Sequence, residues 1–240
     1  MNIKHIISLV YIFLSGFTFC QEINERLSLI QSIKIDTNEL KNLYDNAWEL
    51  LYSNPDSALI LAEQHIQLSK QLENYNIEFG LYLKGTISLQ LGNPKISLEC
   101  YYDVLKLNEQ KFDSLGIAKS YRDIGTVFNY MGEANKSKEF YEKAISFFKA
   151  KKEDIELAQT LNNYGIILMK SGEYEKGIRV LNEALSYKKR ALKDSRNEKE
   201  KEKLETGIAL LESNLGLIYM NQNKTNEALI NLINATKIYS

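Results

Sequence analysis

A short pattern returns along this chain at a nearly fixed interval. A glycine is followed seven residues later by a residue suited to a tight turn, in the pairs Gly85 and Gly92, Gly125 and Gly132, Gly165 and Gly172, and Gly216 and Asn223. The first three pairs are 40 residues apart. Such a period is typical of an array of similar structural units, each of which buries its apolar face against its neighbours.

The segments between these turns have the periodicity of helices. From about residue 37 onward, apolar residues recur at spacings of three and four, and no strand pattern competes. Asn54–Pro55 and Asn93–Pro94 suit helix starts, with asparagine as N-cap and proline in the first helical position. We expect helix pairs at 38–52 with 55–73, 76–91 with 94–110, 114–131 with 134–151, 153–171 with 174–192, and 198–222 with 225–239.

The second helix of each pair has its own register. Five residues after the turn comes a small residue, then a large one, then another small one, as in Ser137, Tyr141 and Ala144. Small residues allow two antiparallel helices to approach closely, so Ala144 and Ala184 should lie in tight contacts. The large residue should fill the groove between neighbouring hairpins.

This register resembles the tetratricopeptide repeat, and residues 162–185 are the closest copy. The resemblance implies an all-α fold, a right-handed α-solenoid of about five antiparallel helix hairpins. It covers 38–240, with repeats at 38–75, 76–112, 113–152, 153–196 and 197–240. The period of 40 exceeds the usual length of about 34, and the proline that commonly ends a repeat is absent. Longer repeats of this kind are similar to those in the sensor regions of bacterial regulators, including pheromone-receptor and MalT-like families.

The first 20 residues predict a signal peptide. Residues 6–19 form an uncharged apolar run, shorter than a membrane-spanning helix, which needs about 20 residues. Thr18 and Cys20 are small enough for cleavage before Gln21, which would leave residues 21–37 as an N-terminal lead-in and export the protein to the periplasm or the medium. An uncleaved anchor and a lipoprotein with lipidated Cys20 are alternatives, and Phe19 argues against the second.

The composition indicates no catalytic, metal or cofactor site. After cleavage one cysteine, Cys100, and one histidine, His65, remain, too few for a disulfide or a zinc site of ordinary spacing. We interpret both as buried structural residues. There is no phosphate-binding loop, nucleophile elbow or metalloprotease motif. With 30 basic against 31 acidic residues, nucleic acid is not an expected partner.

The resemblance implies a groove lined by the first helices, where a protein or peptide would bind. Its positions fall on Phe79, Tyr82, Thr86 and Leu89 in the second repeat, Lys119, Arg122, Thr126 and Asn129 in the third, and Gln159, Asn162, Ile166 and Met169 in the fourth. We expect Asn side chains to pair with a ligand backbone, and Lys119 and Arg122 to meet a carboxylate.

One interval is longer than the others. Gly165 and Gly216 are 51 residues apart, 11 more than 40, and the surplus falls in 188–205, with eight basic and five acidic residues. Shared between two antiparallel helices, it would lengthen each by about 8 Å. This extension is either a solvated protrusion or a docking site for an anionic partner.

Two functions follow from these expectations. The first is a non-enzymatic protein- or peptide-binding scaffold in an extracytoplasmic compartment. The second is the sensor region of a larger bacterial signalling protein, a histidine kinase or a transcriptional regulator, with a membrane segment only if the chain continues past residue 240. The last hairpin has no distinctly polar outer helix, which also suggests self-association there.

Overall fold

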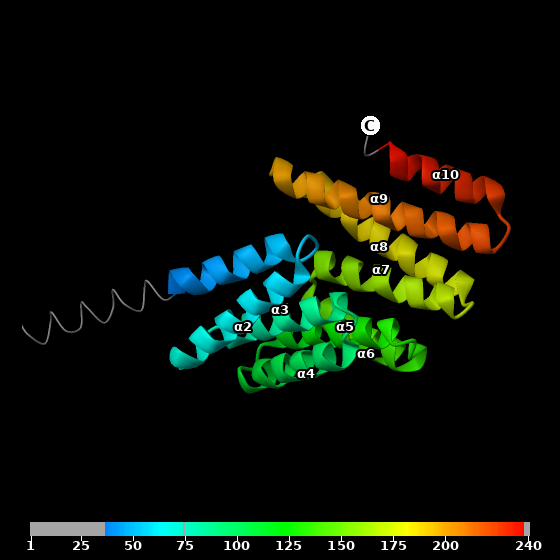
Figure 1. Cartoon of the computed structure of the whole chain (residues 1–240). Coiled ribbons are helices and arrows are strands. Elements are labelled where there is room, and N and C mark those ends of the chain that lie inside the picture. The colour runs from blue at the N-terminus through cyan, green and yellow to red at the C-terminus, as the bar shows by residue number, and fades with distance from the viewer. Residues whose placement is uncertain (1–36, 74, 238–240) are drawn as a thin grey trace, which may run out of the picture. The chain divides into compact units, whose positions relative to one another are not determined.

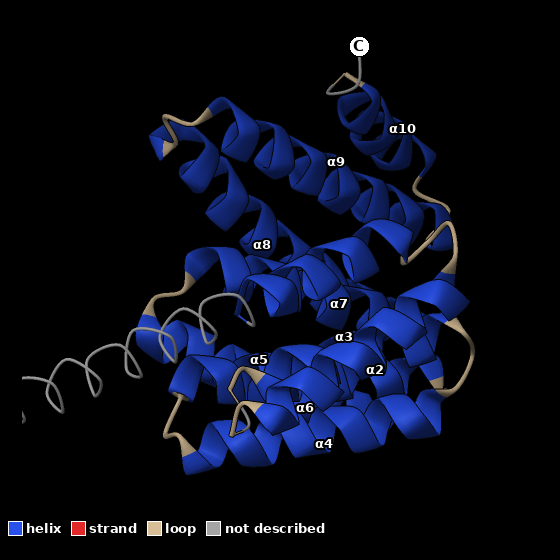
Figure 2. Ribbon diagram, turned by 60° about the vertical axis from the view of Figure 1, so that its left-hand side comes forward, coloured by secondary structure: helices blue, strands red, loops and turns tan. Residues whose placement is uncertain are grey.

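The computed structural model describes residues 37–73 and 75–237, and within these ranges every regular element is a helix (Figure 2). The predicted signal peptide and most of the lead-in fall on residues 1–36, outside the described residues. The chain divides into two compact units, Met1–Leu91 and Gly92–Ser240, which are described one at a time.

The helices start and end close to the predicted positions. In the first unit, residues 37–50 are helical, followed by α2 (Pro55–Gln71) and α3 (Ile77–Gln90). The second unit contains α4 (Pro94–Gln110), α5 (Ser114–Tyr130), α6 (Ala134–Lys151), α7 (Asp154–Lys170), α8 (Tyr174–Asp194), α9 (Glu198–Asn221) and α10 (Thr225–Thr236) (Figure 1).

The predicted turn residues adopt the left-handed backbone conformation that such a turn requires. Gly132 has φ of 78° and Asn223 has φ of 58°, and glycine accepts this conformation at least cost. The N–H of Glu133 then reaches back to the carbonyl of Phe128 at 2.9 Å, which satisfies a helix-end acceptor. Turns between repeats use the same geometry without glycine, at Phe112 and Lys152.

The two Asn-Pro helix starts differ from each other. Both prolines occupy the first helical turn, as predicted. Asn54 caps α2 by accepting a hydrogen bond from the Ser57 N–H at 3.2 Å. Asn93 stands at the cap position of α4, but its side chain makes no capping hydrogen bond there.

Each hairpin of the second unit packs a large side chain against a glycine. A Cβ added at Gly165 would lie 2.5 Å from Leu181, and one at Gly125 would lie 3.1 Å from the ring of Tyr141. The main contact of the large residue is therefore with the glycine of its own hairpin. Tyr141 also packs with Tyr164 of the next hairpin, so the predicted filling between hairpins is a second contact of the same ring.

The small positions lie where the helices are closest. Ala144 and Ala184 are completely buried, as predicted. Ser137 is also buried, and its hydroxyl donates to the carbonyl of Gly125 at 2.8 Å. A larger side chain at any of the three would push the two helices of its hairpin apart.

The predicted lengthening around 188–205 occurs in both helices. α8 has 21 residues and α9 has 24, whereas α5 and α7 have 17 each. A short connection joins them, in which Asn197 caps α9 by accepting from the Glu200 N–H at 3.2 Å. Extension of two helices, rather than a long loop, accommodates the surplus residues.

His65 lies in the core of the first unit. It is 2% exposed, its Nδ1 is 3.3 Å from the Ser69 hydroxyl, and its ring contacts Tyr44. This placement agrees with a structural role. Burial lowers the pKa of His65 below its ordinary value of 6.5, because the charged imidazolium loses hydration.

We therefore expect acid to destabilise the first unit through His65. The folded chain holds His65 neutral, so its contribution is present above pH 6.5 and is lost as the pH falls from 6.5 toward the lowered pKa, by at most about 1.4 kcal/mol per pH unit. Urea unfolding between pH 7.5 and 5.5 measures this. The slope should be smaller in His65→Gln, and equal slopes in the two proteins would contradict the assignment.

Candidate partner-binding face

The first helices of the repeats form one side of the second unit. α5 contacts α7, and α7 contacts α9, while each also contacts the helices before and after it in sequence. Helices that approach their counterparts in neighbouring repeats lie on the inside of a curved array. We call this side the inner face, defined by four equivalent positions on each helix: Lys119, Arg122, Thr126 and Asn129 on α5, Gln159, Asn162, Ile166 and Met169 on α7, and Leu210, Ser213, Leu217 and Met220 on α9.

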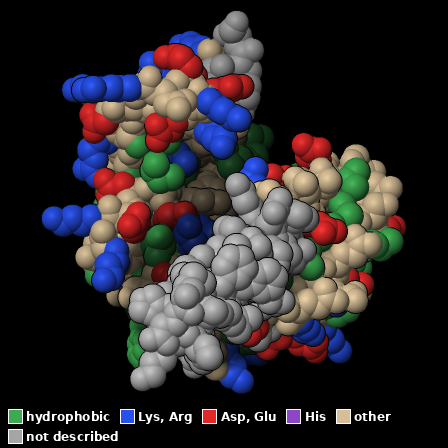
Figure 3. Space-filling model, turned by 90° about the vertical axis from the view of Figure 1, so that its left-hand side faces the viewer, with side chains coloured by type: hydrophobic (Ala, Val, Ile, Leu, Met, Phe, Trp, Pro, Cys, Tyr) green, Lys and Arg blue, Asp and Glu red, His purple; other side chains and the backbone are tan. Residues whose placement is uncertain are grey.

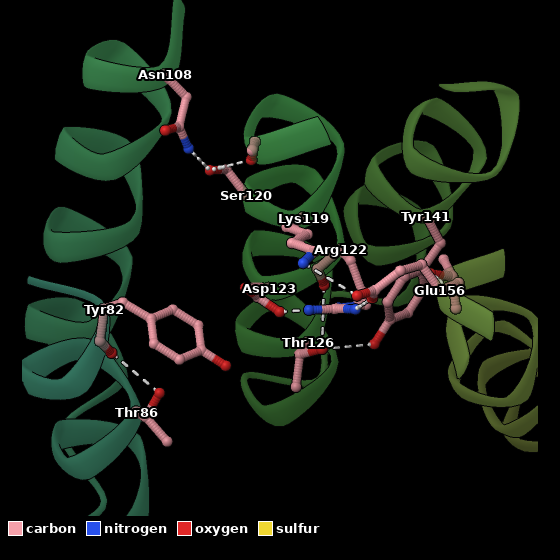
Figure 4. Close-up of polar contacts among 12 residues, drawn as sticks. Tyr82, Thr86, Asn108, Lys119, Ser120, Arg122, Asp123, Thr126, Tyr141 and Glu156 are labelled. Carbon is pink, nitrogen blue, oxygen red and sulfur yellow. Dashed lines mark hydrogen bonds and ion pairs between the residues drawn. The ribbon is translucent and has the colours of Figure 1, made fainter. Parts of the chain in front are cut away.

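Two basic residues of α5 meet an acidic residue of α7 on this face. The Glu156 carboxylate lies 3.0 Å from the Lys119 ammonium and also accepts a hydrogen bond from Arg122 Nη1 (Figure 4). Burial alone would raise the pKa of the Glu156 carboxyl, but Arg122 and Lys119 outweigh it and hold that pKa below its ordinary value. Glu156 is therefore a carboxylate at neutral pH and joins the two helices.

Arg122 is already paired within the chain. It is 7% exposed, and besides Glu156 it donates from Nε to the Asp123 carboxylate at 3.0 Å. Burial raises the pKa of Asp123 above its ordinary value, although Arg122 opposes this. The sequence suggested that Arg122 is a cation open to a partner's carboxylate, but the carboxylates that it meets belong to its own repeat and the next.

Two predicted asparagines also connect neighbouring first helices. Asn129 of α5 accepts a hydrogen bond from Lys170 of α7 at 3.1 Å. Asn162 of α7 accepts one from Asn214 of α9 at 2.8 Å, and both of these side chains are buried. Together with the Glu156 pairs, these contacts form a row of polar bridges along the inner face.

Thr126 is bonded to its own hairpin. Its hydroxyl donates to the Arg122 carbonyl at 3.1 Å and lies 3.1 Å from the Tyr141 hydroxyl (Figure 4). Burial raises the pKa of Tyr141 to about 12. Thr126 therefore helps to seat the Tyr141 ring.

The side chains that face solvent on α7 are different ones. Gln159 is exposed, while Ile166 and Met169 are half-buried. None of the three takes part in a salt bridge or hydrogen bond within the described part of the chain. A partner could contact them without breaking the bridges between the helices.

The four predicted residues of the second repeat lie in the first unit, on α3. Phe79 is 45% exposed and packs edge-on against Tyr44, with ring centroids 5.7 Å apart. Tyr82 packs against Trp48, and its carbonyl accepts from the Thr86 hydroxyl at 3.0 Å. Leu89 is half-buried. Phe79 is the most exposed of the four.

Sequence reasoning missed the α9 positions of the inner face. Leu210, Leu217 and Met220 are 53%, 44% and 55% exposed. They have the same offsets from Gly216 that Gln159, Ile166 and Met169 have from Gly165. This shared offset is the signal that could have identified them.

The remaining observations concern Cys100, possible metal ligands, surface charge and helix hydrophobicity. Cys100 is buried, as predicted, and no group of three or more His, Cys, Asp or Glu side chains in 37–73 and 75–237 could hold a metal ion. On the face seen in Figure 3, acidic and basic side chains are interspersed. None of the helices described is both long and apolar enough to cross a membrane.

Comparison with known proteins identifies the repeat. The tetratricopeptide repeat family model matches residues 118–150 and 158–190. No curated protein matches the chain in sequence.

Several solved structures share the fold. BtubC (BKLC) from P. vanneervenii is 13% identical with a TM-score of 0.59, covering 86% of this chain and 90% of that one. A putative kinesin light chain from Podosopora anserina with nearly identical TPR-like repeats is 13% identical with a TM-score of 0.62, covering 83% and 94%. The apo form of RapI is 12% identical with a TM-score of 0.57, covering 84% and 83%. At these identities the likeness concerns the fold alone.

Proposed function

The chain is a tetratricopeptide-repeat protein, and from this premise we propose that it is a non-enzymatic scaffold that binds a protein or peptide along the inner face. The observation that carries the proposal is that one set of side chains on that face joins the helices and a different set faces solvent. Buried polar residues such as Arg122 and Asn162 join the first helices to one another, while Gln159 is exposed to solvent. Ile166 and Met169 are half-buried. A face held rigid by its own bridges can bind a partner without first being ordered.

A matched pair of substitutions tests this role. A partner captured from cell extracts with the tagged chain would be titrated against Gln159→Arg and Asn182→Arg. Both residues are exposed, but Asn182 lies on the second helix α8, where its amide donates to the Ile178 carbonyl of its own helix.

We expect Gln159→Arg to weaken binding by about tenfold, or 1.4 kcal/mol, and Asn182→Arg to leave it unchanged. Loss of affinity only in Asn182→Arg, or equal loss in both variants, would show that the inner face is not the binding surface.

We also propose that the scaffold is exported. The support is the apolar run 6–19, with small residues at 18 and 20 beside the expected cleavage position. Mass spectrometry of the protein from its native cells should find Gln21 at the N-terminus. A membrane-bound chain that begins at Met1 would indicate an anchor instead, and a soluble chain with residue 1 intact would contradict export.

A second candidate is the sensor region of a larger signalling protein. The observation that favours it is the apolar outer side of α10, where Leu229, Ile230 and Ile233 are exposed. In the preceding hairpin the equivalent of Leu229 is Ile178, which packs into the core beside α9. A following segment or a second copy of the chain would cover α10 in the same way. Sedimentation of the chain alone separates these, since self-association gives a dimer that Ile230→Asp dissociates.

A further inference from the structure

The inner face changes from charged to apolar across the second unit. α5 contributes Lys119 and Arg122, α7 contributes both polar and apolar side chains, and α9 contributes mainly apolar ones. Leu210, Leu217 and Met220 are separated by seven and three residues, so they lie along one side of the helix. At 1.5 Å per residue they span about 15 Å. We call these three residues the apolar stripe.

The apolar stripe places three exposed apolar residues on one side of a single helix, next to further apolar residues of α7. All three side chains are about half exposed, and Ile166 and Met169 occupy the equivalent positions on the adjacent helix α7. The Asn162–Asn214 hydrogen bond joins these two helices, and Asn214 lies one turn from both Leu210 and Leu217. Exposed aliphatic side chains grouped in this way are typical of a site of interaction.

A cluster of charges lies at one end of the apolar stripe. Lys119 and Arg122 both pair with Glu156, Arg122 also pairs with Asp123, and Lys188 lies near enough to Glu156 to feel its charge. The cluster therefore holds three basic side chains and two acidic ones. The two carboxylates are mostly shielded, whereas the Lys119 side chain is 41% exposed, so a basic group is the part of the cluster that an incoming ligand meets first.

Lys188 connects the charge cluster to the apolar stripe. It comes from α8, is half-buried, and lies against Gly207, less than one turn before Leu210. Burial lowers the pKa of Lys188 below its ordinary value, and the charge of Glu156 only partly opposes this. No salt bridge joins Lys188 to any residue within 37–73 and 75–237. A half-buried ammonium without an ion-pair partner favours an anion beside it.

We propose that this face binds a peptide segment with an acidic side chain followed by aliphatic side chains. The acidic group pairs with Lys119 and Lys188, and the aliphatic groups cover the apolar stripe. The proposal deepens the proposed scaffold function and rests on it. A basic segment would place like charges together at the lysines, and a purely polar one would leave the apolar stripe in water.

The dimensions of the face set the spacing in the peptide. The apolar stripe extends about 15 Å from Leu210, and an extended peptide advances about 3.3 Å per residue. The aliphatic residues should therefore fall within about five or six positions of the acidic one.

Three pools of fluorescent nonapeptides test the proposal against the whole chain. All are acetylated and amidated, so that only side chains are charged: one pool combines Asp or Glu with Leu and Met, one combines Lys with Leu and Met, and one combines Asp or Glu with Ser and Asn. Fluorescence anisotropy should give the acidic–aliphatic pool an affinity at least tenfold above the other two. Equal binding of the pools, or preference for the basic pool, would overturn the proposal.

Variants then assign the two contacts. Leu217→Asn should reduce affinity for the acidic–aliphatic pool by about tenfold, and Lys188→Gln should reduce its advantage over the basic pool. Asn182→Arg, on the far side of the hairpin, should change neither. If all three variants bind like the wild type, the peptides bind elsewhere and the proposal fails.

The result also separates this inference from the scaffold function. A natural partner that depends on Gln159 while the pools show no preference would leave the scaffold intact and reject the acidic–aliphatic ligand. Dependence of the pools on Leu217 with a natural partner insensitive to Gln159 would support peptide binding on the inner face and show that this particular partner binds elsewhere.

Discussion

Replacing Tyr141 by alanine should lower the free energy of unfolding by about 4 kcal/mol, the largest effect that we expect from any single substitution. Its ring is fully buried on Gly125 and beside Tyr164, so truncation removes contacts to two hairpins and leaves a cavity between them. Urea unfolding followed by circular dichroism measures the change.

Tyr141→Phe is the matched control for this substitution. It keeps the ring and removes only the hydroxyl beside Thr126, so it should cost about 1 kcal/mol. If Tyr141→Ala cost no more than Tyr141→Phe, the ring would not be the link between the hairpins that its packing indicates.

Replacing Arg122 by methionine should cost about 3 kcal/mol of stability. The substitution leaves Asp123 and Glu156 close together and poorly hydrated, without the guanidinium that lies between them. Removal of one partner from a buried ion pair is costly because the other charge stays buried. The same unfolding measurement gives the value.

A double-mutant cycle separates the pair from simple loss of packing. Arg122→Met combined with Glu156→Gln should cost clearly less than the sum of the two single changes, because Glu156→Gln removes the negative charge that otherwise repels Asp123 once the guanidinium is gone. Strict additivity would contradict the pairing. If Arg122→Met left stability unchanged and abolished partner binding, Arg122 would instead bind a carboxylate of the partner, as the sequence suggested.

The hairpins of α5 with α6, α7 with α8, and α9 with α10 could be predicted because their signals are local. Gly132 and Asn223 mark turns through their own backbone conformation, and the match of a large residue to a helix glycine, as in Leu181 and Gly165, is contained within one repeat. The positions of the inner face follow from the same register, which is why Gln159 and Ile166 could be named from the sequence.

The pairings on that face could not be predicted in this way. Glu156 reaches back to Arg122, 34 residues earlier, and this distance depends on how neighbouring repeats are offset, which no single repeat specifies. The apolar stripe could have been predicted from the sequence. Leu210, Leu217 and Met220 have the same offsets from Gly216 that the predicted groove positions of the preceding repeat have from Gly165.

The most direct test of partner binding on the inner face is photo-crosslinking. A benzophenone amino acid at position 159 should form a crosslinked species with the partner, and the same group at position 182 should form none, because only the first position lies on the inner face. The account predicts crosslinking from 159 that excess unlabelled chain abolishes. Crosslinking from 182 alone, or equal yields from both positions, would contradict it.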